Sequence, residues 1–165
     1  MIDSLKVPKE TVETIKKIKH EIEKGTGTKI RIDDCEIIID GDTLNSYNAQ
    51  RIIKAVARGF PPKDALRLAK DETCFEIIEI RDFGGKTRND LVRLRGRIIG
   101  EKGKAKRNIE NLTNTSISVS GKTVGIIGEV EGVMEAKEAV TSLLQGSKHG
   151  TAYKLIERKK VFKKE

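Results

Sequence analysis

A pair of glycines three residues apart interrupts a basic stretch, which reads Arg97-Ile98-Ile99-Gly100-Glu101-Lys102-Gly103-Lys104-Ala105-Lys106-Arg107-Asn108-Ile109. Glycine adopts backbone angles that other residues avoid, so this spacing predicts a sharp bend between two helices. Such a bend leaves N–H groups free at the start of the second helix, where the helix dipole also favours an anion. The basic side chains around the bend are Lys102, Lys104, Lys106 and Arg107. The segment therefore predicts a place where a phosphate can lie on the backbone.

The positive charge of the chain is concentrated in its second half. The 165 residues include 33 Lys and Arg against 25 Asp and Glu, which gives a net charge of +8. Residues 1–72 hold 14 basic and 13 acidic side chains, whereas residues 73–165 hold 19 and 12. A local excess of this kind favours a surface that binds a polyanion. The alternative is a solvated surface rich in Lys and Glu, as in heat-adapted proteins.

The sequence contains an internal repeat. A shift of 87 residues aligns 22–59 with 109–146 without a gap. Nine of the 38 aligned pairs are identical: Ile22/Ile109, Glu23/Glu110, Thr26/Thr113, Thr28/Thr115, Ile30/Ile117, Ile39/Ile126, Gly41/Gly128, Ala49/Ala136 and Gly59/Gly146. Because the apolar positions also stay in phase, the alignment predicts two copies of one small fold.

Each copy is predicted to be α+β, with its elements in the order β-α-α-β-β-α. Alternating apolar residues predict one hairpin from 29–33 and 36–40, and a second from 116–119 and 123–127. Apolar residues at helical spacing predict a closing helix in each copy, formed around Leu44, Ala49, Ile52, Ile53 and Val56 and around Val133, Ala136, Val140, Leu143 and Leu144.

Two domains follow from the repeat. We expect the first at residues 1–72, ending in a short linker helix, and the second at 73–165, ending in a basic C-terminal helix. The first copy lacks the glycine bend, because Glu13 and Lys16 occupy the positions equivalent to Gly100 and Gly103. A side chain there would fill the space that a phosphate needs. We therefore expect the first domain to brace the second or to bind a protein.

The surroundings of the glycine bend resemble a KH domain. Two β-branched residues precede Gly100, an isoleucine follows six positions after Gly103, and two strands and a helix come next. With Gly-Arg-Ile-Ile-Gly from Gly96 and Ser-Gly-Lys-Thr-Val from Ser120, nearly the whole chain resembles the archaeal relatives of the "partner of Nob" pre-rRNA processing proteins. The resemblance is most specific over 95–128, and it implies two tandem type I KH-like domains, the first without its GxxG loop.

This resemblance implies a single-stranded RNA-binding protein, because a KH GxxG loop clamps four nucleotides. The implied RNA-binding residues are Arg97, Ile98, Ile99, Gly100, Glu101, Lys102, Gly103, Lys104, Lys106 and Arg107. Glu101 departs from the basic residue that KH loops often carry at that position. The implied target is the 3′ end of small-subunit rRNA during ribosome assembly. The implied partners are the Nob-type endonuclease, the rRNA dimethyltransferase and the alpha subunit of translation initiation factor two.

The resemblance also implies an aliphatic groove beside the loop, where the bases lie. Its candidate lining residues are Ile98, Ile99, Ile109, Ile117 and Val119. The alternative is that these side chains belong to the core, and for Ile109 and Ile117 this alternative is at least as strong.

Catalysis and metal binding are not predicted. Two Gly-Lys-Thr triplets lack the glycine that a nucleotide-binding P-loop needs five positions earlier, where Ile80 and Ser116 stand. His20 and His149 lie far apart in the sequence and far from either cysteine, so no metal-ligand spacing is present. We therefore expect no enzyme activity, no metal and no cofactor.

The sequence predicts a cytoplasmic protein that does not contact membranes. No segment approaches the ~20 consecutive apolar residues of a membrane helix. The early charged residues Asp3, Lys6 and Lys9 argue against a signal peptide. Two cysteines cannot build a disulfide framework, which favours a reducing compartment.

Two functions of different kinds remain open. One is an RNA-binding assembly factor that uses the second domain, with mRNA or DNA as a weaker choice of ligand. The other is a protein–protein scaffold in ribosome assembly or translation initiation that uses the first domain. The contrast between the two copies favours RNA binding, because a pure scaffold has no reason to keep a charged glycine bend in only one of them.

Overall fold

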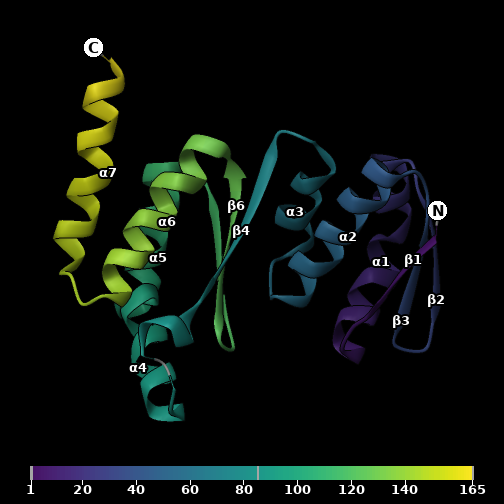
Figure 1. Cartoon of the computed structure of the whole chain (residues 1–165), viewed down its shortest axis with the longest axis horizontal. Helices are drawn as coiled ribbons and strands as arrows, with labels where there is room; N and C mark the ends of the chain where they lie inside the picture. Colours follow the sequence, from purple (N-terminus) through teal and green to yellow (C-terminus); the bar gives the residue numbers. More distant parts are fainter. Residues whose placement is uncertain (1, 85, 165) are drawn as a thin grey trace. The chain divides into compact units, whose positions relative to one another are not determined.

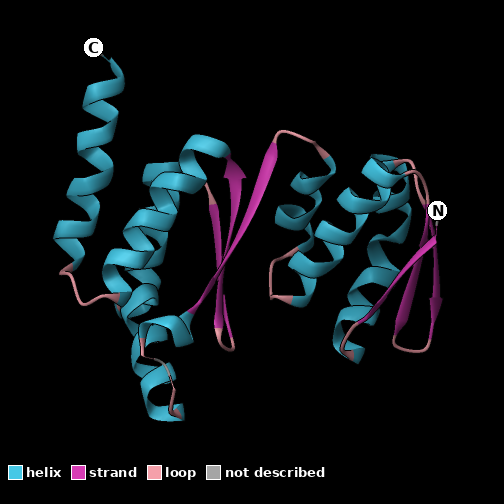
Figure 2. Ribbon diagram, viewed as in Figure 1, coloured by secondary structure: helices cyan, strands magenta, loops and turns pink. Residues whose placement is uncertain are grey.

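The computed structural model describes residues 2–84 and 86–164 and divides the chain into two compact units, Met1–Thr73 and Cys74–Glu165. In each unit, helices cover one face of a three-stranded sheet (Figure 1, Figure 2). This is the mixed α+β architecture that the sequence predicts.

The first unit contains one long helix between its first two strands. Its elements are β1 (Ile2–Lys6), α1 (Lys9–Thr26), β2 (Lys29–Asp33), β3 (Glu36–Asp40), α2 (Thr43–Ala57), the short helix α3 (Pro62–Ala65) and the 3-10 helix η1 (Leu66–Ala69). The strands pair antiparallel in the order β1-β3-β2. The predicted hairpin around Asp34 is confirmed, and Asp34 adopts a positive φ of 54° at its turn.

The order β-α-α-β-β-α is wrong for the first unit, which is β-α-β-β-α before its linker helices. Helix α1 runs unbroken through the positions equivalent to the bend. Glu13 and Lys16 replace the two glycines there, and their side chains form an ion pair at 3.5 Å on the exposed face of the helix. Both residues have a far higher helix propensity than glycine, so the helix continues through this point.

The second unit has the predicted order, with two helices between its first two strands. Its elements are β4 (Thr73–Glu79), η2 (Ile80–Phe83), α4 (Arg88–Ile99), η3 (Glu101–Gly103), α5 (Lys104–Thr113), β5 (Ser116–Ser120), β6 (Thr123–Glu129), α6 (Val130–Leu144) and α7 (His149–Lys164). The sheet order is β4-β6-β5, and β5 and β6 pair antiparallel.

The core of the second unit lies between its sheet and its helices. It includes Leu94 and Ile98 from α4, Ile109 from α5, Val124 and Ile126 from β6, Val140 and Leu143 from α6, and Ala152 and Ile156 from α7. Helix α7 therefore packs on the domain through its apolar side. The core holds the ends of α4 and α5 together, and this fixes the place where the chain bends between them.

Candidate nucleic-acid interface

Gly100 ends helix α4 and allows α5 to pack directly against it. Its φ of 74° lies in the region that favours glycine, and its N–H donates to the Gly96 carbonyl at 2.8 Å. A Cβ atom at Gly100 would lie 2.6 Å from the Cβ of Ala105 and 2.8 Å from the Ala105 nitrogen. The sequence predicts that a phosphate chain lies on the open side of both glycines. For Gly100 this is wrong, because α5 occupies that side.

The next residues reverse the chain direction through two more positive φ angles. Lys102 has a φ of 55° and Gly103 a φ of 75°. The Gly103 N–H donates to the Gly100 carbonyl at 3.2 Å, which closes the bend. A Cβ at Gly103 would approach only the tip of Arg107, at 3.1 Å from its Nη1 atom. Gly103 is therefore the glycine whose open side faces a flexible side chain rather than the backbone of the fold.

The N-terminus of helix α5 lies at the bend and favours an anion. Its N-cap is Gly103, which has no side chain to cap the first amides of the helix. Lys102 and Lys104 are exposed beside these amides, as is Glu101. The N–H groups, the helix dipole and two lysines thus converge at one place, which is the arrangement that binds phosphate in many proteins. We call Gly100–Lys104 the GxxG bend.

Two of the predicted RNA-binding side chains make hydrogen bonds beside the bend. Arg107 is exposed, and its Nη1 donates to the Lys102 carbonyl at 2.8 Å, so it braces the bend from the next turn of α5. Lys106 is half-buried and pairs with Glu110 at 3.3 Å. Much of its charge is therefore balanced within the helix.

Arg97 and Ile98 point into the domain rather than toward a ligand. Ile98 is fully buried in the core, so its predicted contact with RNA is wrong. The Arg97 guanidinium donates from Nε to the Leu143 carbonyl at 3.0 Å and from Nη2 to the Ser147 carbonyl at 2.5 Å. A side chain held by two backbone carbonyls of its own domain is not presented to a phosphate.

Of the five side chains predicted to line an aliphatic groove, three are buried in the core and two are half-buried. Ile109 and Ile117 are buried in the core together with Ile98. Ile99 and Val119 remain half-buried, and they are the members of the predicted set that keep some accessible surface.

Sequence reasoning assigned no role to His149 and did not single out Arg95. Nε2 of His149 lies 2.7 Å from the Arg97 carbonyl, and Nη1 of Arg95 donates to the Gly121 carbonyl at 3.2 Å. Both contacts join segments at least 26 residues apart in the chain. No local pattern signals them, because neither residue belongs to a motif.

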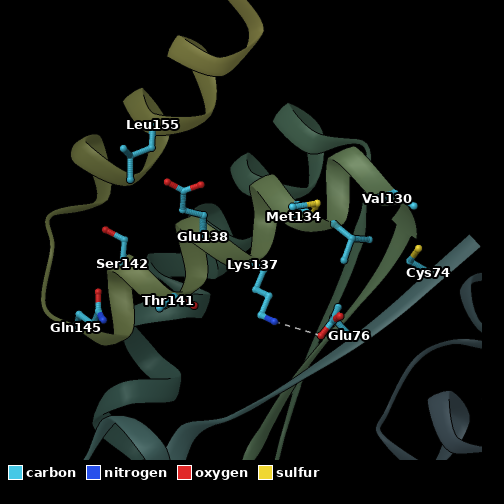
Figure 3. A pocket seen from close by; sticks show the side chains of 11 residues that line it. Cys74, Glu76, Val130, Met134, Lys137, Glu138, Thr141, Ser142, Gln145 and Leu155 are labelled. Atoms are coloured by element: carbon cyan, nitrogen blue, oxygen red, sulfur yellow. Dashed lines mark hydrogen bonds and ion pairs between the residues drawn. The ribbon is translucent and has the colours of Figure 1, made fainter. Parts of the chain in front are cut away.

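A separate groove of about 720 Å³ lies on helix α6, between strand β4 and Leu155 of α7. Figure 3 shows Val130 and Met134 at one end and Gln145 and Ser142 at the other. None of the predicted RNA-binding residues line it. Its Lys137 is paired with Glu76 at 3.4 Å, so the groove lacks the positive charge of the GxxG bend.

Other kinds of site are not evident in the described part of the chain. Residues 2–84 and 86–164 contain no group of three or more His, Cys, Asp or Glu side chains that could hold a metal ion. Across the same residues, no helix is long and apolar enough to cross a membrane.

Comparison with known proteins shows that the bend lies within a segment that matches a known domain family. The model of the eukaryotic-type KH domain (KH-domain type I) matches residues 74–161. A KH domain-containing protein of Methanocaldococcus jannaschii is 44% identical over 169 residues, which cover 96% of this chain and 74% of that protein. The pre-rRNA-processing protein PNO1 of Aspergillus oryzae is 35% identical over 114 residues, which cover 68% of this chain. The matched part is only 44% of the length of the Aspergillus protein.

The structure is also similar to one chain of a solved complex. The aDim2p-type chain in the crystal structure of the a/eIF2alpha–aDim2p–rRNA complex from Pyrococcus horikoshii OT3 superposes with a TM-score of 0.85 at 38% identity. The match covers 97% of this chain and 94% of that one. The likeness therefore extends over both units.

Proposed function

Because the chain belongs to the KH-domain family of pre-rRNA-processing proteins, we propose that it binds single-stranded RNA through the GxxG bend and acts in ribosome assembly. Binding, rather than catalysis, is the activity that this family membership supports. The second unit, Cys74–Glu165, is the RNA-binding KH domain in this proposal.

One observation carries the proposal, namely the contrast between the two units. They share the same hairpin and closing helix, but only the second bends its chain at Gly100–Lys104 and exposes Lys102 and Lys104 there. In the first unit an ion pair between Glu13 and Lys16 occupies the equivalent positions on a continuous helix. A scaffold alone would need no such difference. A phosphate-binding corner requires it.

The proposed contacts with RNA come mainly from the backbone and from exposed lysines. The amides in the first turn of α5 receive phosphates, with Lys102 and Lys104 beside them. Ile99 and Val119 offer apolar surface to the bases. Among the other predicted residues, Gly100, Gly103 and Arg107 shape the bend. Glu101 adds a negative charge, and the charge of Lys106 is paired with Glu110.

We propose the 3′ end of small-subunit rRNA as the target. The support is the resemblance over 95–128 and the presence of rRNA in the Pyrococcus complex with the similar chain. Crosslinking of the full chain to total cellular RNA, followed by sequencing, tests this choice. Enrichment at the 3′ end of the small-subunit rRNA is expected. Enrichment spread over mRNA instead would overturn it.

The direct test of RNA binding compares two matched substitutions in the full chain. Gly103→Asp places a carboxylate at the bend, where its Cβ meets only the movable end of Arg107. Lys16→Asp places a carboxylate at the equivalent position, on the exposed face of α1. We expect the first variant to lose most of its affinity for a single-stranded rRNA oligonucleotide and the second to keep it. Circular dichroism checks that both remain folded. Equal affinity of both variants would contradict the proposal.

A protein-binding role of the first unit is a second candidate. It is favoured by the missing bend and by the a/eIF2alpha subunit that shares the Pyrococcus complex with the similar chain. The proposed partners are the alpha subunit of initiation factor two, the Nob-type endonuclease and the rRNA dimethyltransferase. Calorimetric titration of each purified partner into the full chain tests this role. Binding that Gly103→Asp leaves unchanged is expected, since the bend takes no part in it.

A further inference from the structure

The end of helix α4 is tied to the connection between α6 and α7 by a reciprocal contact of one residue. The Arg97 side chain donates to the carbonyls of Leu143 and Ser147, at 3.0 and 2.5 Å. The Arg97 main-chain carbonyl in turn lies 2.7 Å from Nε2 of His149. Figure 1 shows the chain passing from α6 to α7 beside this end of α4. Three contacts thus join segments about 50 residues apart in the sequence.

The Arg97 side chain caps the C-terminal end of helix α6. The Leu143 carbonyl is among the last in that helix, and the Gly146 N–H donates to it as well. Carbonyls at the end of a helix have no partner within it and carry partial negative charge. The Arg97 guanidinium adds a charged donor to the Leu143 carbonyl at this end, and its positive charge is favourable there. This explains why Arg97 is half-buried and turned away from solvent.

The hydrogen bond to the Arg97 main-chain carbonyl lies next to the bend. In an uninterrupted helix, the Arg97 carbonyl would accept the N–H of residue 101, four positions later. Helix α4 stops at Ile99, and Gly100 turns the chain away. A carbonyl oxygen only accepts, so Nε2 of His149 is the donor to Arg97. The Arg97 carbonyl therefore accepts a hydrogen bond from His149, at the start of α7, in place of the one that the residue 101 N–H would donate in a straight helix.

We propose that Arg97 and His149 are positioning residues that hold the GxxG bend in its RNA-binding shape. They act through the backbone and touch no RNA. The clamp formed by Arg97, Leu143, Ser147 and His149 opposes straightening of the chain at Gly100–Lys104. This inference rests on the proposed function, because the bend is the RNA site in that proposal. It also assigns a role to the first turn of α7, which the KH order of elements does not require.

The first unit is consistent with this assignment. The position equivalent to Arg97 is Glu10, in the first turn of the continuous helix α1. That unit has no bend at the equivalent place, and a carboxylate cannot donate to the carbonyls at the end of a helix. The bend and the residue that supports it thus occur in the same unit and are replaced together in the other.

Salt dependence separates a positioning residue from a phosphate contact. Loss of one phosphate contact with single-stranded RNA changes the slope of log affinity against log salt by about 0.7. We expect Arg97→Gln and His149→Ala each to weaken binding of an rRNA oligonucleotide about tenfold, as for a lost hydrogen bond to a charged or constrained group, with the wild-type slope. Arg93→Gln is the matched control, because it removes the same charge from an exposed position of the same helix.

Two further variants test whether the residues act together. The double variant of Arg97→Gln and His149→Ala is expected to bind no more weakly than the worse single variant, because each change opens the same clamp. His149→Gln keeps a side-chain N–H near the position of Nε2 and is expected to restore most of the affinity. The proposal would be overturned if Arg97→Gln changed the salt slope or if His149→Ala kept the wild-type RNA affinity. It would also be overturned if the two losses of binding free energy added in the double variant.

Hydrogen exchange in the RNA-free protein distinguishes this inference from the proposed function. The Gly103 amide donates to the Gly100 carbonyl within the bend, and its exchange reports whether the bend opens. We expect faster exchange of that amide in Arg97→Gln and His149→Ala than in wild type and Arg93→Gln. Unchanged exchange overturns the clamp whatever the RNA result. Failure of the wild type to bind RNA, or full binding by Gly103→Asp, overturns the proposed function instead.

Discussion

The Glu110 carboxylate accepts the main-chain N–H of Ile117 at 2.9 Å, and this contact closes the corner between α5 and β5. Glu23 and Ile30 make the same contact in the first unit, at 2.8 Å. Both pairs are identical residues 87 positions apart. The repeat in the sequence therefore marks a repeated hydrogen bond.

Glu110→Ala and Glu23→Ala should destabilise the protein by similar amounts. Each leaves a strand N–H without its charged acceptor, which costs ~1–3 kcal/mol. Urea unfolding monitored by circular dichroism measures the effect as a lower midpoint. Glu21→Ala is the control, since Glu21 is exposed on the same helix as Glu23. A loss in only one unit would show that the two corners are not energetically equivalent.

The two glycines of the bend should respond differently to alanine. Gly100→Ala forces a Cβ against Ala105 at 2.6 Å and strains a positive φ, so α5 must move. Gly103→Ala meets only the end of Arg107, at 3.1 Å. We expect Gly103→Ala to cost ~1–2 kcal/mol for its left-handed backbone and Gly100→Ala to cost more. Unfolding midpoints decide, and equal losses would contradict the packing argument.

RNA binding should weaken steeply as salt rises. Four phosphate contacts to a single strand, at about −0.7 each, give a slope near −3 in a plot of log affinity against log salt. Fluorescence anisotropy of a labelled oligonucleotide measures this slope. A value near zero would mean that the exposed lysines take no part in binding.

Reversal of charge at the bend should weaken binding to all sequences alike. Lys102 and Lys104 are exposed and are proposed to contact phosphates, which carry no sequence information. We expect Lys102→Glu and Lys104→Glu to lower the affinity for several unrelated single-stranded RNAs by the same factor. Lys17→Glu is the control, because Lys17 is the exposed equivalent of Lys104 in the first unit. A loss confined to one RNA sequence would indicate base recognition instead.

Glycines introduced into the first unit should not create a second RNA site. The double substitution Glu13→Gly and Lys16→Gly removes their ion pair and lowers the stability of α1 by ~1 kcal/mol per residue. The position equivalent to Lys102 is the buried Ile15, and the clamp of the second unit is absent, so RNA affinity should stay at the wild-type value. A large gain in a binding titration would reveal a latent site in α1.

The pattern of the sequence was sufficient for the hairpins, the closing helices and the bend. Strand residues alternate, helix residues recur at helical spacing, and glycines mark the break. These signals are local, and so the structure agrees with them. The exception among the apolar positions is Leu44, which is 54% exposed because it lies in the first turn of α2, beyond the edge of the core.

The roles of individual side chains at the bend could not be predicted in the same way. Charge counts made Arg97 and Arg107 equivalent to Lys102 and Lys104, but the fold uses both arginines to hold main-chain carbonyls. Their partners are set by packing between distant segments, which no spacing reveals. The order β-α-α-β-β-α was wrong for the first unit because it was carried over from the second, although the repeat aligns only from residue 22 onward.

The paired hydroxyls at the same corners have a consequence for how the two halves could diverge. Thr26 and Thr28 lie 2.8 Å apart, as do Thr113 and Thr115. Each pair begins at the last residue of a helix, Thr26 of α1 or Thr113 of α5, and so lies at the other end of α5 from the bend. The contacts that shape each module are thus separate in sequence from the contacts that recognise a ligand. One module can therefore lose a bend such as Gly100–Lys104 while keeping its architecture, as the continuous helix α1 of the first unit shows.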